Sequence, residues 1–163
     1  MKKILATVAL STLLVGCAAP SVTPPSANTG NHVDTYHADF SEVWEHAVDW
    51  FAINNIPIKN IERDSGIISS DYSLGAGYSQ VDCGAVDPGG MHILIDQAVT
   101  ANINVLVRDR SGQISVQPNV FGQGAFTFRN TWDNRLTETI RVDRCVTTGE
   151  LERSLQNHIQ SRI

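Results

Sequence analysis

The sequence predicts an α+β fold, with an antiparallel sheet of about 4–6 strands, two helices on one face of that sheet and one disulfide. Three observations support this prediction. Apolar residues recur at helical spacing near the start and the end of residues 34–163, apolar and polar residues alternate between these stretches, and two cysteines lie in the same region. This length and this element order are those of a single domain.

The first helix is predicted over residues 40–51, where the apolar side chains share one face. Asp39 stands three residues before Glu42, which predicts a capping box at the start of the helix. Asn54 and Pro57 predict its end. The apolar face consists of Phe40, Val43, Trp44, Ala47, Val48 and Phe51.

A β-hairpin is predicted after this helix. Isoleucines at positions 56, 58 and 61 precede Asp64–Gly66, which has turn composition, and Ile67 and Ile68 follow it. The next segment, residues 73–100, is rich in glycine and predicts a strand fragment around Tyr78–Cys83 followed by a loop.

More strand is predicted beyond this loop. Residues 103–107 and 114–116 alternate between apolar and polar side chains, and Asp109–Gly112 between them predicts a tight turn. Val120, Phe121, Phe126 and Phe128 predict a further strand. Gly122 and Gly124 are expected to interrupt it.

The C-terminal part ends in the second helix. Residues 129–144 fit either a strand extension or a short helix, and the sequence leaves both open. Thr147 and Glu150 have the spacing of a capping box at the start of the helix that follows. Its buried stripe is predicted to be Leu151, Leu155 and Ile159.

Residues 1–16 have the composition of a secretory signal peptide. Lys2 and Lys3 precede an apolar run from Ile4 to Val15. A membrane-spanning helix needs about 20 apolar residues, so this run is too short to be one.

The end of this run, Leu14-Val15-Gly16-Cys17, resembles the bacterial lipobox, which is the cleavage site of signal peptidase II. The resemblance implies cleavage before Cys17, diacylglycerol on its thiol and an acyl chain on its freed amine. Ala18 in the next position implies an outer-membrane address. The domain is expected to face the periplasm. More than one acyl chain gives a stable anchor, since each buried methylene contributes about 0.8 kcal/mol.

Residues 17–33 are predicted to be the lipidated cysteine and a flexible tether, because they are rich in Pro, Ser, Thr, Ala and Asn and have no apolar periodicity. A coil of this length has a root-mean-square span of roughly 20–24 Å. With Cys17 lipidated, Cys83 and Cys145 form an even pair in an exported protein, which favours a disulfide. The alternative is a catalytic thiol at Cys83 with His92 as its base.

The charge of the chain excludes one class of partner. The formal net charge is -5, and loss of Lys2 and Lys3 with the leader leaves 10 basic against 17 acidic residues. Nucleic acid is therefore not an expected partner. No cofactor or metal is predicted, because Asp82, Asp87 and His92 lie in one glycine-rich loop and are typical of solvated turns.

Two segments also resemble a known family. ADFSEVWEHAVDWFAINNIPIKNIERDSGIISSDYS and RCVTTGELERSLQNHI are similar to the helix-grip domains of small outer-membrane lipoproteins, such as the C lipoprotein subunit of the β-barrel assembly machinery. The resemblance covers roughly residues 38–72 and 100–160, with one such domain where that subunit has two. It implies a helix-grip-like fold and an envelope address, and it supplies no catalytic residues.

The sequence favours a non-enzymatic docking or accessory module of an envelope protein complex. Candidate interaction residues are Tyr72, Tyr78 and Trp132, because aromatic side chains dominate interface hot spots; the alternative for each is a half-buried structural role. A second hypothesis is a carrier or sensor of a small apolar ligand or lipid, in a helix–sheet groove lined by Ile103, Phe121, Phe126 and Phe128. A hydrolase is less favoured, since no nucleophile motif is present.

Overall fold

The computed structural model describes residues 18–26, 32–71, 74–75 and 79–163. The predicted leader, the lipobox Leu14–Cys17, Tyr72 and Tyr78 lie outside the described residues. The elements in chain order are β1 (Ser21–Thr23), β2 (Asp34–Tyr36), α1 (Phe40–Ile53), β3 (Ile58–Glu62), β4 (Ile67–Ser70), β5 (Leu74–Gly75), β6 (Val81–Asp82), β7 (Ala85–Asp87), β8 (His92–Arg110), β9 (Gln113–Asn130), β10 (Leu136–Thr147) and α2 (Glu150–Gln160).

The fold is α+β, as the sequence predicts, and its main sheet has more strands than expected. Its path runs β3-β4-β8-β9-β10-β6, while β2 joins β9 and β5 joins β8, so the sheet has eight strands. Every recorded strand pair is antiparallel. A separate two-stranded sheet pairs β1 with β7.

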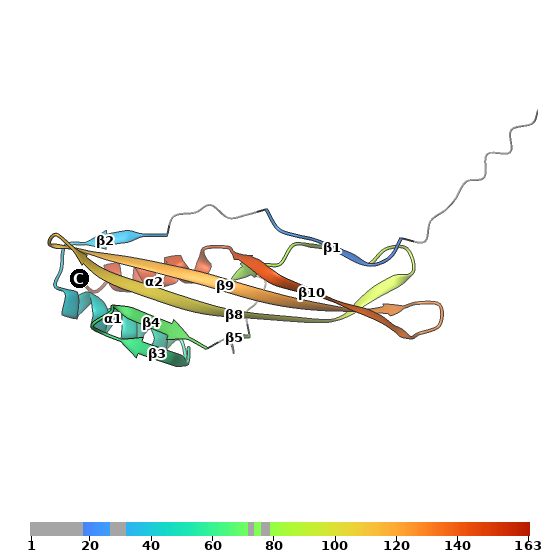
Figure 1. Cartoon of the computed structure of the whole chain (residues 1–163), viewed down its shortest axis with the longest axis horizontal. Coiled ribbons are helices and arrows are strands. Elements are labelled where there is room, and N and C mark those ends of the chain that lie inside the picture. The colour runs from blue at the N-terminus through green and yellow to red at the C-terminus, as the bar shows by residue number, and fades with distance from the viewer. Residues whose placement is uncertain (1–17, 27–31, 72–73, 76–78) are drawn as a thin grey trace, which may run out of the picture.

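A long hairpin gives the molecule its elongated shape (Figure 1). Strand β8 has 19 residues and β9 has 18, and the two stay paired from Arg110–Gln113 to His92–Asn130. Ser111 and Gly112 join them with φ of 57° and 87°, the positive values of a two-residue hairpin turn. At about 3.3 Å per residue, β8 extends roughly 60 Å.

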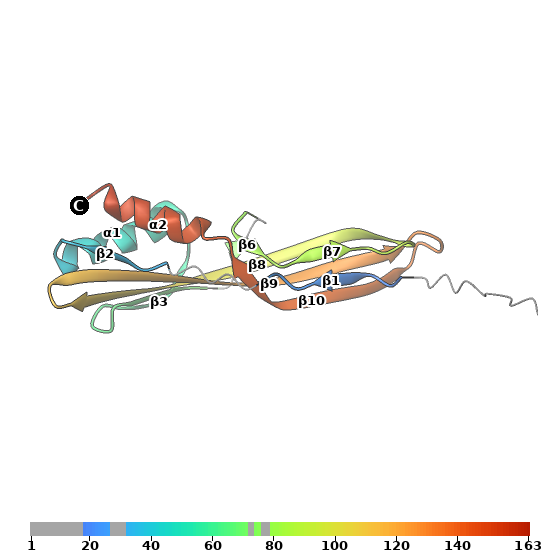
Figure 2. The ribbon, with the colours of Figure 1, turned by 90° about the horizontal axis from the view of Figure 1, so that it is seen from above.

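One face of β9 is buried along most of the strand, but different layers cover the two halves of the hairpin. The even-numbered residues of β9 from 114 to 128 are buried. Helices α1 and α2 cover the half near the Ser111–Gly112 turn, while β1 and β7 lie over the other half (Figure 2). Val22 of β1 and Val86 of β7 pack against the core there. We call these halves the helical end and the distal end.

The predicted interruption of β9 by glycine is wrong, and the reason is packing. The strand continues through Gly122 and Gly124. A Cβ on Gly124 would lie 3.0 Å from Sγ of Cys83, and one on Gly122 would lie 3.1 Å from Cβ of Cys145. These two glycines therefore make room on the buried face for the disulfide between Cys83 and Cys145, which the structure confirms.

Substitution of Gly124 by Val is expected to destabilise the protein by about 1–3 kcal/mol, because the added methyl groups overlap Sγ of Cys83 and the ring of Phe126. Urea unfolding at equilibrium measures this change. Gly90→Val is the matched control, because nothing lies within 4 Å of a Cβ at Gly90. Equal midpoints for the two variants would show that the packing at Gly124 has no energetic consequence.

Two further regions are defined by the structure, the glycine-rich segment before β8 and residues 129–144. The predicted loop after Cys83 is shorter, since β7 lies within it and β8 already begins at His92. A bulge between Leu94 and Asp96 shifts the register of β8 and reverses its alternation, which hides this part of the strand from pattern analysis. Residues 129–144, for which the sequence left two possibilities open, are the end of β9, a five-residue turn and most of β10.

The helix bounds agree with the sequence, but the predicted capping boxes are absent. The side chain of Asp39 makes no cap hydrogen bond to α1. At the start of α2, the hydroxyl of Thr147 accepts from the amide of Gly149 at 2.9 Å and donates to the Glu152 carboxylate at 2.8 Å. Gly149 itself occupies the N-cap position with φ of 79°.

Part of the predicted tether is structured. Residues 18–26 include β1, in which Ser21, Val22 and Thr23 pair with Asp87, Val86 and Ala85. Gly89, with φ of 70°, approaches the carbonyl oxygen of Ala18 so closely that a Cβ there would overlap it. Residues 18–26 are thus fixed to the distal end, in contrast to the flexible segment predicted there, while positions 17 and 27–31 of the predicted tether lie outside the described residues.

Candidate interaction surfaces

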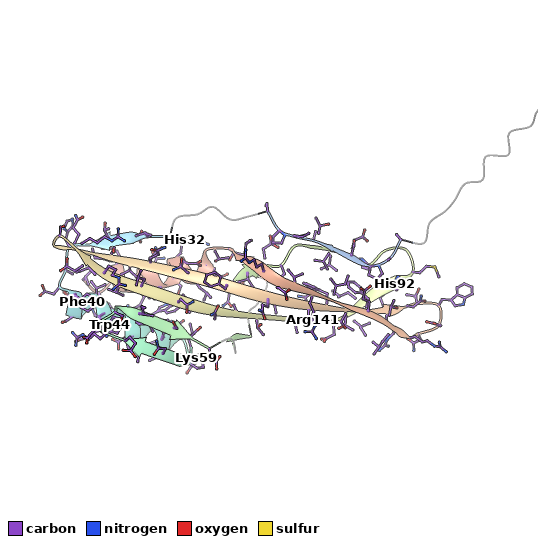
Figure 3. The ribbon with its side chains drawn as sticks, viewed as in Figure 1. His32, Phe40, Trp44, Lys59, His92 and Arg141 are labelled. Atoms are coloured by element: carbon purple, nitrogen blue, oxygen red, sulfur yellow. A yellow bond between two sulfur atoms is a disulfide. The ribbon has the colours of Figure 1, made fainter. Side chains whose placement is uncertain are left out.

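The two helices and the sheet enclose a filled core. Trp50 and Phe51 of α1, Leu155 and Ile159 of α2, and Ile103 of β8 are all buried. Polar contacts also fasten α2: the indole of Trp50 donates to the hydroxyl of Ser154 at 3.1 Å. The stacked rings of Phe40 and Trp44 on α1, 5.9 Å apart, belong to this packing: Trp44 is buried, and Phe40 packs against the core (Figure 3).

The four residues proposed to line a ligand groove do not share one. Ile103, Phe126 and Phe128 are fully buried on the covered face of the sheet. Phe121 points to the opposite face and is 52% exposed. It borders a surface groove of about 470 Å³ where β10 diverges from β9, together with Gln123, Asp143 and Arg144.

The acidic residues of the glycine-rich loop have local roles. Oδ1 of Asp82 accepts from the amide of Gly84 at 2.7 Å, and Oδ1 of Asp87 accepts from the amide of Gly89 at 2.9 Å. Both contacts are Asx turns of the kind that stabilise loops. His92 lies near the distal end of β8 (Figure 3). Within the described ranges, no group of three or more His, Cys, Asp or Glu side chains is placed to hold a metal.

Cys83 is not a free thiol, because it is bonded to Cys145. The two cysteines are 62 positions apart in sequence. The bond joins Cys83, the residue after β6, to Cys145 of β10, which is five positions before the start of α2. It lies between the helical and distal ends. The alternative of a catalytic cysteine at Cys83 is therefore wrong.

A sheet edge is exposed at β3. This strand ends the sheet path, pairs with β4, and is exposed at all five of its residues. Ile58 and Ile61 are among the large apolar side chains in solvent. Lys59, 3.9 Å from the carboxylate of Asp71, is the cation on this edge (Figure 3). The sequence predicts that these isoleucines belong to a hairpin. It does not predict that their strand is at an edge, because this depends on the strand order in the folded sheet.

A second exposed region is the turn between β9 and β10 at the distal end (Figure 1). Trp132 lies in this turn and is exposed, in contrast to a half-buried structural role. Leu136, the first residue of β10, and Ile93 of β8 are exposed as well. Sequence analysis singled out Trp132 for its residue type but missed the other two, because their proximity depends on strand register.

A titratable group lies where α2 meets α1. Burial lowers the pKa of His158 from its ordinary value of 6.5, and the positive charges of Arg162 and His46 lower it further, while Asp49 opposes them. The folded protein therefore binds a proton at this site less readily than the unfolded chain. The resulting stability is present above about pH 6.5 and is lost as the pH falls through the lowered pKa.

We expect the free energy of unfolding to decrease between pH 7 and pH 5, and His158→Gln to reduce that decrease, because Gln does not titrate. Urea unfolding at the two pH values measures the effect. His37→Gln is the control, since His37 is exposed and lies before α1. The interpretation fails if His158→Gln and the unsubstituted protein lose the same stability on acidification.

Comparison with known proteins adds no relative. No protein-family model matches the chain, and a search of curated proteins also finds no match. Among the described residues, no helix has the length and apolar character needed to cross a membrane.

Proposed function

We propose that the protein is an outer-membrane lipoprotein whose periplasmic domain is a non-enzymatic docking module of an envelope protein complex. The lipobox Leu14–Cys17 supports the anchor, and the close approach of Ala18 to Gly89 supports anchorage from the distal end. If the chain is anchored beside Ala18, its helical end extends up to about 60 Å from the membrane, because β8 has about that length. The helical end is then presented to partners.

The exposed edge strand β3 is the observation that carries the docking function. An edge strand has unpaired backbone donors and acceptors along one side, and apolar residues on it favour addition of a partner strand. Ile58 lies opposite the buried Ser70 and Ile61 opposite the buried Ile68, so both isoleucines extend the apolar face beyond the covered core. The filled core supports docking over the carrier hypothesis, because a carrier needs an apolar space between helix and sheet.

Photo-crosslinking in intact cells tests this function. A photoreactive residue at position 61 is expected to form one defined adduct with an envelope protein, identified by mass spectrometry. The matched control is position 113, which is also exposed and is also at the helical end. Equal adducts from both positions, or adducts from neither, would contradict docking through β3.

Ile61→Arg is expected to reduce recovery of that partner by about tenfold or more, because it places a charge where an apolar contact of hot-spot size is lost. Quantitative pull-down of the crosslinked or native complex measures the loss. The same substitution at exposed Gln113 should leave recovery unchanged. A complex that tolerates Arg at position 61 requires a different contact surface.

A further inference from the structure

The turn at the distal end is rigid, although it presents a tryptophan to solvent. The amide of Asn130 donates to the carbonyl of Arg135 at 2.9 Å, and the amide of Trp132 donates to Oδ1 of Asn130 at 2.8 Å. The amide of Thr131 reaches across to the carbonyl of Met91 at 3.0 Å. The hydrogen bonds therefore fix the backbone of the turn, while the indole of Trp132 remains 86% exposed.

Strand register places more apolar surface at the same end of the sheet as this tryptophan. Arg129 pairs with Ile93 on one side and with Leu136 on the other, so the three side chains share one face of the sheet. Leu136 is 67% exposed and Ile93 is 48% exposed. We call Trp132, Leu136 and Ile93 the tip cluster. Arg129, which donates to Oδ1 of Asn134 at 3.4 Å, supplies positive charge between them, whereas Arg135 lies 3.8 Å from the carboxylate of Asp133 in the same turn.

The described chain begins beside the same tip. Ala18 contacts Gly89, and Gly89 stands two residues before Met91, which binds Thr131 of the turn. Cys17 precedes Ala18 directly in the sequence. An acyl chain attached to Cys17 therefore enters the membrane next to the tip cluster, and the ordered β1 leaves little free chain to separate them.

We propose that the tip cluster is a membrane-contact site that rests in the headgroup region of the bilayer holding the lipid anchor. Tryptophan is favoured at membrane interfaces because its ring is apolar and its N–H remains hydrogen-bonded. Leu136 and Ile93 add buried apolar area, and Arg129 between them is the cation for a lipid phosphate. The site rests on the anchorage in the proposed function, and it fixes the orientation of the domain, with β3 facing away from the membrane.

Depth-dependent fluorescence quenching tests the contact. The mature lipidated protein is reconstituted into vesicles of phosphatidylethanolamine and phosphatidylglycerol, with and without lipids that carry a nitroxide near the headgroup. Trp44 and Trp50 are buried at the helical end, so Trp132 provides the accessible emission. The expected result is loss of Trp132 emission with the nitroxide lipid, together with a blue shift of that emission in vesicles.

Trp132→Phe is the matched variant, because the exposed side chain can be exchanged without changing the core. Its remaining emission should be insensitive to the nitroxide lipid. Leu136→Ser with Ile93→Ser should reduce the quenching of Trp132. Unquenched Trp132 emission in anchored protein would overturn the proposal. This result would be obtained if the tip is in water, or if a protein or a second copy of the chain covers it. Quenching that persists in Trp132→Phe would also overturn the proposal.

The contact and the anchorage fail separately. The mass of the mature chain shows whether acyl groups are present, and quenching shows whether the tip reaches the bilayer. An acylated chain with unquenched Trp132 would contradict the tip contact but would still support the anchorage. A chain without acyl groups would contradict the anchorage, and therefore also the proposed function.

Discussion

A Cys17→Ser variant is expected to lose acylation and to disappear from the outer-membrane fraction, which is the largest effect predicted for any single substitution in this chain. In the proposed lipoprotein the thiol of Cys17 is the acceptor for the diacylglycerol, and a serine hydroxyl is a much weaker nucleophile at neutral pH. Two or more acyl chains give stable attachment, whereas their loss removes most of the membrane affinity. Metabolic labelling with an alkyne fatty acid and membrane fractionation measure both effects.

The other two cysteines provide the control for this experiment. Cys83 and Cys145 are joined to each other and lie in the folded domain, so their replacement should leave the fatty-acid label unchanged. Label that remains in Cys17→Ser, or that is lost when Cys83 and Cys145 are replaced, would place the lipid on another residue and contradict the lipobox.

The second large effect concerns stability. Replacement of both Cys83 and Cys145 by Ala is expected to lower the free energy of unfolding by about 4 kcal/mol, on the chain-entropy model for a loop of this size. The loss includes packing, because the disulfide fills the space opposite Gly122 and Gly124 on the buried face. Urea unfolding with and without reductant measures it.

The reductant serves as an internal control. Reduction of the unsubstituted protein should lower the unfolding midpoint toward that of the double alanine variant, and reductant should not affect the variant itself. Non-reducing mass spectrometry should recover the peptides of Cys83 and Cys145 as one linked species. Free thiols at both positions in protein exported to the periplasm would contradict the disulfide in the cell.

The parts of the fold that sequence predicts well are those set by local pattern. The apolar face of α1 has a regular helical spacing, and Ser111-Gly112 between alternating strands is a strong hairpin signal. The disulfide follows from counting the cysteines of an exported chain once Cys17 is assigned to lipid. Each of these predictions needs only nearby residues or composition.

The predictions that fail depend on residues far apart in the sequence. Gly122 and Gly124 suggest a broken strand until the disulfide that packs on them is known. The bulge after Leu94 reverses the alternation of β8, so the pattern seen at Ile103 cannot be extended back to His92. The composition of residues 18–26 is that of a tether, and their order comes from pairing with β7.

The candidate surfaces divide in the same way. Aromatic residue type alone points to Trp132, but the cluster around it appears only when the register brings Ile93 and Leu136 to either side of Arg129. The edge position of β3 likewise follows from strand order, which the sequence does not specify. The roles of Tyr72 and Tyr78 in interaction stay predictions, since both lie outside the described residues.

Anchorage through Cys17 is the central claim, because the orientation of the domain and the presentation of β3 both depend on it. The most direct test is the intact mass of the mature protein extracted from outer membranes. Lipidation at the lipobox predicts a chain that begins at Cys17 and carries a diacylglycerol and an additional acyl group on that residue. A chain that begins elsewhere, or one in which Cys17 has a free thiol, would contradict it.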